Sequence, residues 1–103
     1  SPECDCWGHN DVAIVPDLGM MASFDPVALD QACADLVNKA PVINGWKPSA
    51  GYSYAGGECS CGCNDHQHTE LFKHIHPDTD WESGLQYAQE IGLGCREYEL
   101  VEV

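Results

Sequence analysis

Five of the seven cysteines fall in two short clusters, Cys4-Asp5-Cys6 and Cys59-Ser60-Cys61-Gly62-Cys63. Two histidines, His66 and His68, follow the second cluster. Thiolates and imidazoles are the side chains that hold zinc, copper or iron in proteins. Because residues 7–58 separate the clusters, only folding can bring them to one ion. A shared metal would therefore constrain the path of the long segment between them.

The spacing of the first cluster suits a tetrahedral metal. Side chains at i and i+2 of an extended segment point to the same face, and zinc–sulfur bonds of about 2.3 Å place two bound sulfurs roughly 3.8 Å apart. In an extended chain the outer sulfurs of the second cluster would lie about 13 Å apart, so a turn at Gly62 must close it. The clusters could form one four-ligand site or two sites, or remain reduced without metal. The predicted ligands are Cys4, Cys6, Cys59, Cys61 and Cys63, with His66 and His68 in reserve.

The remaining cysteines and histidines have simpler interpretations. Cys33 lies within an apolar helical stripe and is predicted to be a small core residue. Cys95 follows Gly94 at a predicted junction and is interpreted as structural. His74 and His76 flank Ile75 beside a proline and are predicted to cap a helix or lie on the surface.

Composition narrows the class of protein. A chain of 103 residues is expected to form one domain. Its net charge of −13 makes nucleic acid and anionic membranes poor partners, and no apolar run approaches the ~20 residues that span a bilayer. An odd number of cysteines argues against a fully paired disulfide framework. We therefore expect reduced or metal-bound thiols in the cytoplasm, with a disulfide-stapled secreted domain as the alternative.

Capping signals predict two main helices. Asp25 is a good N-cap, Pro26 suits the first helical position, and the helix should end near residue 39 or 40, before Pro41. A second helix should follow Thr79, which with Glu82 fits a capping box, and should end at Gly92. A short helix is expected over residues 69–74.

Two segments are predicted to be strands. Val12–Val15 is short, apolar and β-branched, and the alternation over Glu97–Leu100 is typical of a strand exposed on one face. Between the helices, residues 41–58 are rich in glycine, proline and aromatic residues and are expected to form a long loop that leads into the second cluster. The expected fold is therefore a small α/β or α+β domain, with two main helices packed on a short sheet.

Five segments carry a family resemblance: Cys-Asp-Cys-Trp at 4–7, Val-Pro-Asp-Leu-Gly at 15–19, Ser-Phe-Asp-Pro-Val-Ala-Leu-Asp-Gln-Ala at 23–32, His-Pro-Asp-Thr-Asp-Trp at 76–81 and Gly-Leu-Gly-Cys-Arg-Glu-Tyr-Glu-Leu at 92–100. In this order they resemble the carboxy-terminal part of an uncharacterised family of iron–sulfur-associated proteins, domain of unknown function 362. Members of that family are typically longer and carry a ferredoxin-type module ahead of this region. The resemblance implies a redox or metal-linked role in an anaerobic-type cytoplasm, with the four-iron clusters outside this chain.

Three functions remain open at this point. The first is a metal-binding domain of an iron–sulfur protein linked to electron transfer, with zinc in the isolated chain and iron in the parent protein. Its partner would be the ferredoxin-type module or another redox protein, and a homodimer could cover surface that the rest of the parent protein covers. The second is a structural zinc domain that docks a partner. The third is a thiol- or metal-dependent enzyme, such as an oxidoreductase component, for which no dedicated acid–base set is present.

Overall fold

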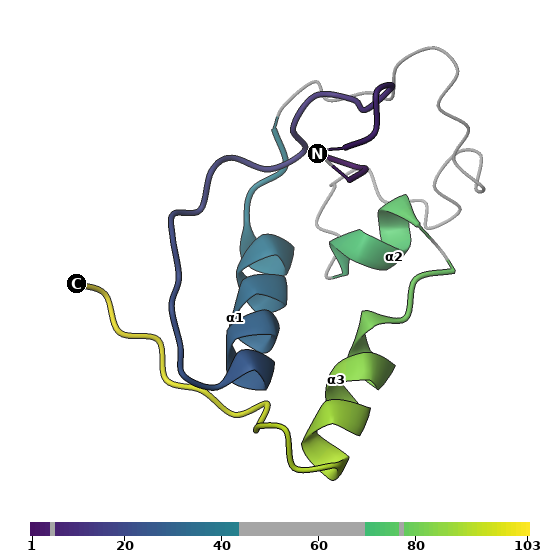
Figure 1. Ribbon diagram of the computed structural model, residues 1–103. Helices are drawn as coiled ribbons and strands as arrows, with labels where there is room; N and C mark the ends of the chain where they lie inside the picture. The colour runs from purple at the N-terminus through teal and green to yellow at the C-terminus, as the bar shows by residue number, and fades with distance from the viewer. Residues whose placement is uncertain (5, 44–69, 77) are drawn as a thin grey trace.

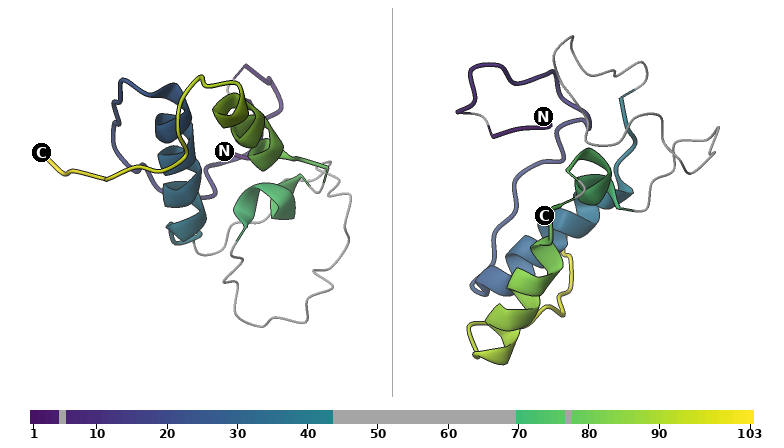
Figure 2. Two further views of the ribbon diagram at one scale, coloured as in Figure 1. Left: turned by 90° about the horizontal axis from the view of Figure 1, so that it is seen from below. Right: turned by 90° about the vertical axis from the view of Figure 1, so that its right-hand side faces the viewer.

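The computed structural model describes residues 1–4, 6–43, 70–76 and 78–103. These residues contain three helices: α1 (Pro26–Lys39), α2 (Leu71–Ile75) and α3 (Trp81–Glu90). Helices α1 and α3 lie side by side and run in opposite directions, and α2 lies near the start of α3 (Figures 1 and 2). None of the helices in these ranges is long and apolar enough to cross a membrane.

Helix α1 begins and ends where its capping residues predict. Asp25 Oδ1 accepts hydrogen bonds from the backbone N–H groups of Val27 at 2.9 Å and Ala28 at 3.1 Å, and Pro26 occupies the first turn. Ala40 is the C-cap, and the proline that follows cannot continue the helix. The predicted bounds of this helix are confirmed.

The two later helices differ slightly from the prediction. Helix α2 starts at Leu71 behind an N-cap at Glu70, rather than at residue 69. The N-cap of α3 is Asp80, whose carboxylate accepts from Ser83 N, so the prediction of Thr79 as the cap was wrong. Thr79 instead belongs to the preceding turn, because its N–H donates to the carbonyl of His76 at 2.9 Å.

Gly92 ends the α3 segment as predicted. Its φ of 77° lies in the left-handed region, which favours glycine because a Cβ would be crowded there. The turn is closed by the N–H of Leu93, which donates to the carbonyl of Ala88 at 2.9 Å.

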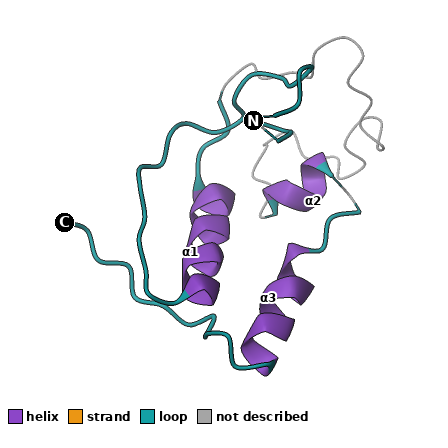
Figure 3. Ribbon diagram, in the orientation of Figure 1, coloured by secondary structure: helices purple, strands orange, loops and turns teal. Residues whose placement is uncertain are grey.

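The predicted α/β or α+β fold is wrong for the described part of the chain, which is helical and contains no strand (Figure 3). Val12–Val15 makes a single cross-chain backbone bond, from Ile43 N to Ile14 O at 2.8 Å, and it bends at Ile14 and Val15. A strand needs a ladder of such bonds. The backbone of residues 97–100 makes no hydrogen bond to the backbone of any other described segment. The two main helices exist, but they pack on each other instead of on a sheet.

The core is small and lies mainly along α1. Its buried apolar residues are Ile14, Val27, Ala28, Ala32, Ala34, Leu71 and Ile75. Ile14, Leu71 and Ile75 form one cluster that joins the segment before α1 to α2. Cys33 is partly buried in α1, in keeping with a small core residue. Helix α3 has no buried residue, and its C-cap Ile91 is 60% exposed.

The carboxy-terminal tail is fastened to the start of α1. Asp25 Oδ2 accepts from the N–H of Cys95 at 2.8 Å, so one carboxylate caps α1 and holds the tail. A Cβ built on Gly94 would lie 2.0 Å from Asp25 Oδ1, and only glycine permits this approach. Further along, Arg96 Nε donates to Gln31 at 2.7 Å. The tail therefore crosses the helix pair at one end before it leads away from the molecule (Figure 1).

Candidate metal-binding loop at the amino terminus

The sulfurs of Cys4 and Cys6 lie 2.9 Å apart at the protein surface. Both side chains are exposed free thiols. The sequence predicts that this spacing brings the two sulfurs together, and the structure agrees. The segment is a turn rather than an extended strand, however, because Trp7 N donates to the Cys4 carbonyl at 2.9 Å.

Asn10 holds the loop closed through its side-chain amide. Its Oδ1 accepts from Glu3 N at 3.1 Å, and its Nδ2 donates to the carbonyls of Glu3 at 3.0 Å and Cys4 at 3.2 Å. The same nitrogen reaches Ser1 Oγ at 3.1 Å. A second backbone bond, from Asn10 N to Trp7 O at 3.1 Å, completes the loop. One amide thus positions the backbone on the amino-terminal side of the two thiols.

The loop is docked on the end of α2. His76 is the C-cap of α2, which confirms its predicted capping role. Its Nε2 lies 2.7 Å from the carbonyl oxygen of Pro2, to which it donates, and 3.8 Å from a carboxylate oxygen of Glu3. Pro2 itself is buried. Beyond the thiols, the rings of Trp7 and His9 meet edge to face with centroids 6.0 Å apart.

The contact between the two thiols makes Cys4 more acidic. A hydrogen bond from the Cys6 side chain lowers the pKa of the Cys4 thiol, and a backbone hydrogen bond from Cys6 adds to this effect. Thiolates, rather than thiols, bind metals. The arrangement therefore favours the form of Cys4 that a metal needs.

The other predicted ligands, Cys59, Cys61, Cys63, His66 and His68, lie outside the described residues. Within residues 1–4, 6–43, 70–76 and 78–103, no three His, Cys, Asp or Glu side chains form a group that could hold a metal ion. Of the predicted ligands, the structure therefore brings together only Cys4 and Cys6 among the residues that it describes.

A second polar cluster joins the three helices around Glu70. Its carboxylate caps α2 by accepting from Lys73 N, and it also accepts from Trp81 Nε1 at 2.9 Å and from Asn38 Nδ2 at 3.3 Å. Asn38 in turn accepts from Leu71 N at 2.8 Å. Desolvation acts to raise the pKa of Glu70, but these hydrogen bonds outweigh it and hold the pKa below its ordinary value.

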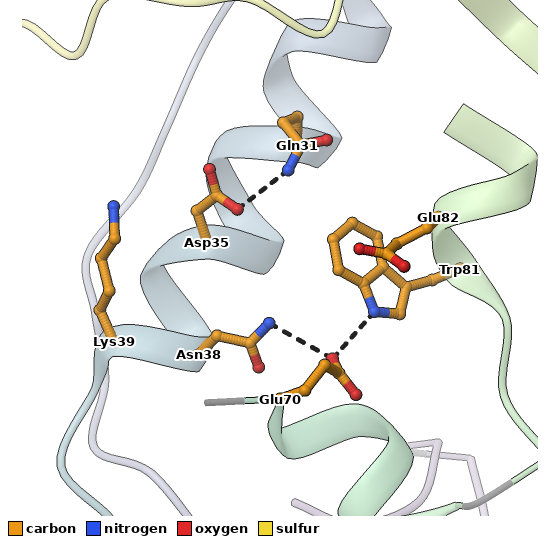
Figure 4. Close-up of a pocket in the computed structure, with 7 residues that line it drawn as sticks. All are labelled: Gln31, Asp35, Asn38, Lys39, Glu70, Trp81 and Glu82. Atoms are coloured by element: carbon orange, nitrogen blue, oxygen red, sulfur yellow. Dashed lines mark hydrogen bonds between the residues drawn. The ribbon is translucent and has the colours of Figure 1, made fainter. Parts of the chain in front are cut away.

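Figure 4 shows the surface pocket, of about 350 Å³, that this cluster borders. Its remaining carboxylates and amides also have partners within the fold. Asp35 accepts from Gln31 Nε2 at 2.9 Å and from the Tyr98 hydroxyl at 2.7 Å, a bond that raises the pKa of Tyr98. Glu82 pairs with Lys73 at 3.3 Å. Because these groups already bond to one another, we assign the pocket a structural role.

Sequence reasoning missed the two residues that organise these clusters. For Asn10 a usable signal exists, because asparagine commonly bonds nearby backbone in turns. Glu70 and Asn38 are 32 positions apart, and no local pattern links them.

A family model described as Domain of unknown function (DUF362) matches residues 1–35. This span includes Cys4, Cys6 and the first part of α1, and over it the chain is similar to that family. The predicted resemblance at 76–81 and 92–100 lies beyond the matched span and stays a prediction, as does the assignment to the carboxy-terminal part of the family. No curated protein and no solved structure gave a significant match to the chain.

Proposed function

We propose that this chain is a metal-binding domain in which the thiolates of Cys4 and Cys6 hold zinc or iron. The observation that carries the proposal is the pair of exposed sulfurs, 2.9 Å apart on one turn. Two sulfurs on one zinc lie roughly 3.8 Å apart, and rotation of exposed side chains can open the pair by that amount. Sulfur donors suit zinc and iron alike, so the residues fit such an ion.

The remaining ligands are proposed to come from the second cluster. Two thiolates complete only half of a tetrahedral site, and the chain offers three further cysteines and two histidines, Cys59, Cys61, Cys63, His66 and His68. In this proposal the metal joins the loop at residues 1–10 to the segment that precedes α2. The two clusters would then share one ion.

A link to electron transfer is the more specific form of the proposal. The family match covers both Cys4 and Cys6, and the sequence resembles iron–sulfur-associated proteins. The chain would bind zinc when isolated and iron or an iron–sulfur centre in a longer parent protein. Its partner would be a ferredoxin-type module or another redox protein in the reducing environment of the cytoplasm.

A structural zinc domain without redox activity is the second candidate. The observation that favours it is how the loop is attached to α2: the imidazole of His76 bonds to Pro2 O at 2.7 Å and lies 3.8 Å from the Glu3 carboxylate. A metal shared with the second cluster would fasten the loop much more strongly. Such an ion would stabilise a surface for a partner protein without changing its oxidation state.

Elemental analysis of protein purified without oxygen tests both candidates. We expect about one ion per chain in the wild type, and loss of that ion in the Cys4→Ser/Cys6→Ser double variant. Cys95→Ser is the matched control, because Cys95 is also exposed but lies far from the loop on the chain, and it should keep the metal. Iron with visible charge-transfer bands supports the electron-transfer form, and stoichiometric zinc supports the structural form. Absence of any ion, together with no uptake of added zinc or iron, would rule out both.

The contribution of the second cluster needs a separate variant. Cys61→Ser should lose most of the bound metal if the clusters share an ion. Unchanged metal content would confine the site to other ligands and would contradict the shared site.

A further inference from the structure

The distance between the sulfurs of Cys4 and Cys6 is intermediate between the distances expected for a metal-bound pair and for a disulfide. At 2.9 Å it is shorter than the roughly 3.8 Å of two sulfurs on one zinc and longer than the roughly 2.05 Å of a disulfide. Among the described residues, the other two cysteines, Cys33 and Cys95, are also free thiols, but neither contacts another sulfur. The pair at the amino terminus is therefore unusual within the described part of the molecule.

We propose that Cys4 and Cys6 have a second, oxidised state, a disulfide within the loop that exchanges readily with small-molecule disulfides such as glutathione disulfide. One cysteine attacks glutathione disulfide, forms a mixed disulfide and releases one glutathione. The other cysteine then attacks the protein sulfur of the mixed disulfide and releases the second glutathione. Two electrons pass from the protein pair to the oxidant, and the two thiol protons end on the two glutathione molecules.

Ring size explains why this bond would be reversible rather than a permanent staple. Only one residue separates the cysteines, so the disulfide closes an eleven-membered ring. Such a small ring is strained, and strained or exposed disulfides are the labile ones that take part in exchange. Because the sulfurs are exposed, a small-molecule disulfide can reach them without unfolding of the chain.

The frame of the loop does not depend on the state of the sulfurs. Asn10 bonds to backbone atoms of Glu3 and Cys4, and the turn is closed by the bond from Trp7 N to Cys4 O. None of these bonds uses a sulfur atom. Oxidation would therefore leave the loop in place and change only the chemistry that it presents.

Oxidation would also compete with metal binding, a consequence that depends on the proposed function. Sulfurs joined in a disulfide are no longer thiolates and cannot serve as the anionic ligands that zinc requires. The same pair would then bind metal in its reduced state and release it in its oxidised state. The disulfide itself can be tested without any metal.

The first experiment uses a variant of the 103-residue chain in which Cys59, Cys61 and Cys63 are serine, so that only the cysteines of the described residues remain. The metal-free protein is equilibrated with glutathione buffers of increasing oxidising strength, quenched in acid and alkylated. A protease that cleaves before aspartate separates residue 4 from residue 5. A Cys4–Cys6 disulfide then joins peptide 1–4 to peptide 5–10, which mass spectrometry detects directly.

We expect two alkylatable thiols per chain to be lost together, and the joined peptides to appear. Cys4→Ser or Cys6→Ser in this background should abolish the joined peptides and leave at most a mixed disulfide with glutathione. Cys33→Ser and Cys95→Ser should retain them. The proposal is overturned if the pair stays reduced in glutathione disulfide alone, or if Cys4 and Cys6 bond to Cys33 or Cys95 instead.

A second experiment separates this inference from the proposed function. In the wild-type chain, bound zinc should slow formation of the Cys4–Cys6 disulfide at least tenfold, and oxidation should release the zinc. If the disulfide forms but neither zinc nor iron ever binds, the proposed function fails and the disulfide stands. If either metal binds and no disulfide forms, the inference fails and the proposed function stands.

Discussion

The amino-terminal loop and the helical part are each organised by single polar side chains, but with opposite results. In the helical part, the carboxylates of Asp25 and Glu70 accept from backbone N–H groups and join separate segments. Around Glu70, the joined helices α1 and α2 also pack apolar residues in one cluster, Val37 against Leu71 and Ile75. In the loop, Asn10 binds the backbone in a similar way, yet the two thiols point into solvent. Similar local bonds thus stabilise a fold in one region and present reactive groups in the other. Stability and chemistry should therefore respond to different substitutions.

Leu71→Ala should have the largest effect on the helical part. Leu71 is buried at 6% exposure in the cluster with Ile14 and Ile75, and truncation of such a side chain costs about 2–4 kcal/mol of unfolding free energy. Urea denaturation measures this loss. The control is Leu100→Ala, where the leucine is 50% exposed and a change within about 0.5 kcal/mol is expected. Equal losses in both variants would show that the cluster is not the core.

Gly94→Ala should be next in size. The added Cβ would collide with the Asp25 carboxylate, which is committed to capping α1 and holding the tail, and we expect a loss of about 1–3 kcal/mol. Gly84→Ala is a control of opposite sign, because Gly84 lies within α3 with open space around it. Alanine there should stabilise the helix by about 0.5–1 kcal/mol. Thermal unfolding measures both changes. A Gly94→Ala variant as stable as the wild type, or a Gly84→Ala variant less stable than it, would contradict these expectations.

Glu70→Gln should lower the stability near pH 7 by about 1 kcal/mol, a figure that allows for partial exposure of the group. The folded state holds the pKa of Glu70 below its ordinary value, so the carboxylate stabilises the fold fully above the unfolded pKa of about 4.3. This stabilisation is lost as pH falls through the folded pKa. The difference between wild type and variant should therefore shrink toward acid pH.

Chemical denaturation at a series of pH values between neutral and acid measures this difference. Glu82→Gln is the control, because it removes only the exposed pair with Lys73, which contributes about 0.5 kcal/mol or less. A wild-type advantage over Glu70→Gln that stayed constant down to strongly acid pH would contradict the role given to the charge.

Of these substitutions, Asn10→Asp should have the smallest effect on the free energy of unfolding and the largest effect on zinc binding by the amino-terminal loop. Aspartate keeps the oxygen that accepts from Glu3 N but removes the donor to the carbonyls of Glu3 and Cys4. We expect less than about 1 kcal/mol of lost stability and roughly tenfold weaker zinc binding, the usual effect of removing a residue that supports metal ligands. Competition with a zinc-sensitive dye measures the affinity. Val12→Ala, on an exposed side chain nearby, should change neither quantity, and a similar loss of affinity there would undermine the role of Asn10.

Local sequence signals predicted the helices correctly, but they did not predict the segments around the helices. The Asp25-Pro26 pair and Gly92 fix helix ends through bonds within a few residues, so the sequence alone is sufficient. The sheet was predicted from β-branched and alternating residues at 12–15 and 97–100, but such a pattern becomes a strand only beside a partner. In the described residues the tail instead bonds through side chains, such as that of Arg96 to Gln31.

The amino-terminal loop was also predictable only in its local features. The i, i+2 spacing of Cys4 and Cys6 guaranteed that their sulfurs could approach, and they do. The residue that holds them, Asn10, acts across a turn whose closure depends on several bonds at once. Spacing cannot reveal such a combination.

The contact between Asp25 and Cys95 has a consequence for how the chain can vary. It closes a loop of 70 positions in sequence, which contains the region between α1 and α2. For a loop this long, the entropy lost on closure rises only with the logarithm of its length, by roughly 0.6 kcal/mol for each doubling. Residues added or removed between α1 and α2 would therefore change the free energy of closing this contact very little. The helical part should therefore tolerate a cysteine-bearing segment of widely varying length. The length of that segment can then change with the chemistry of its cysteines at little cost to the stability of the fold.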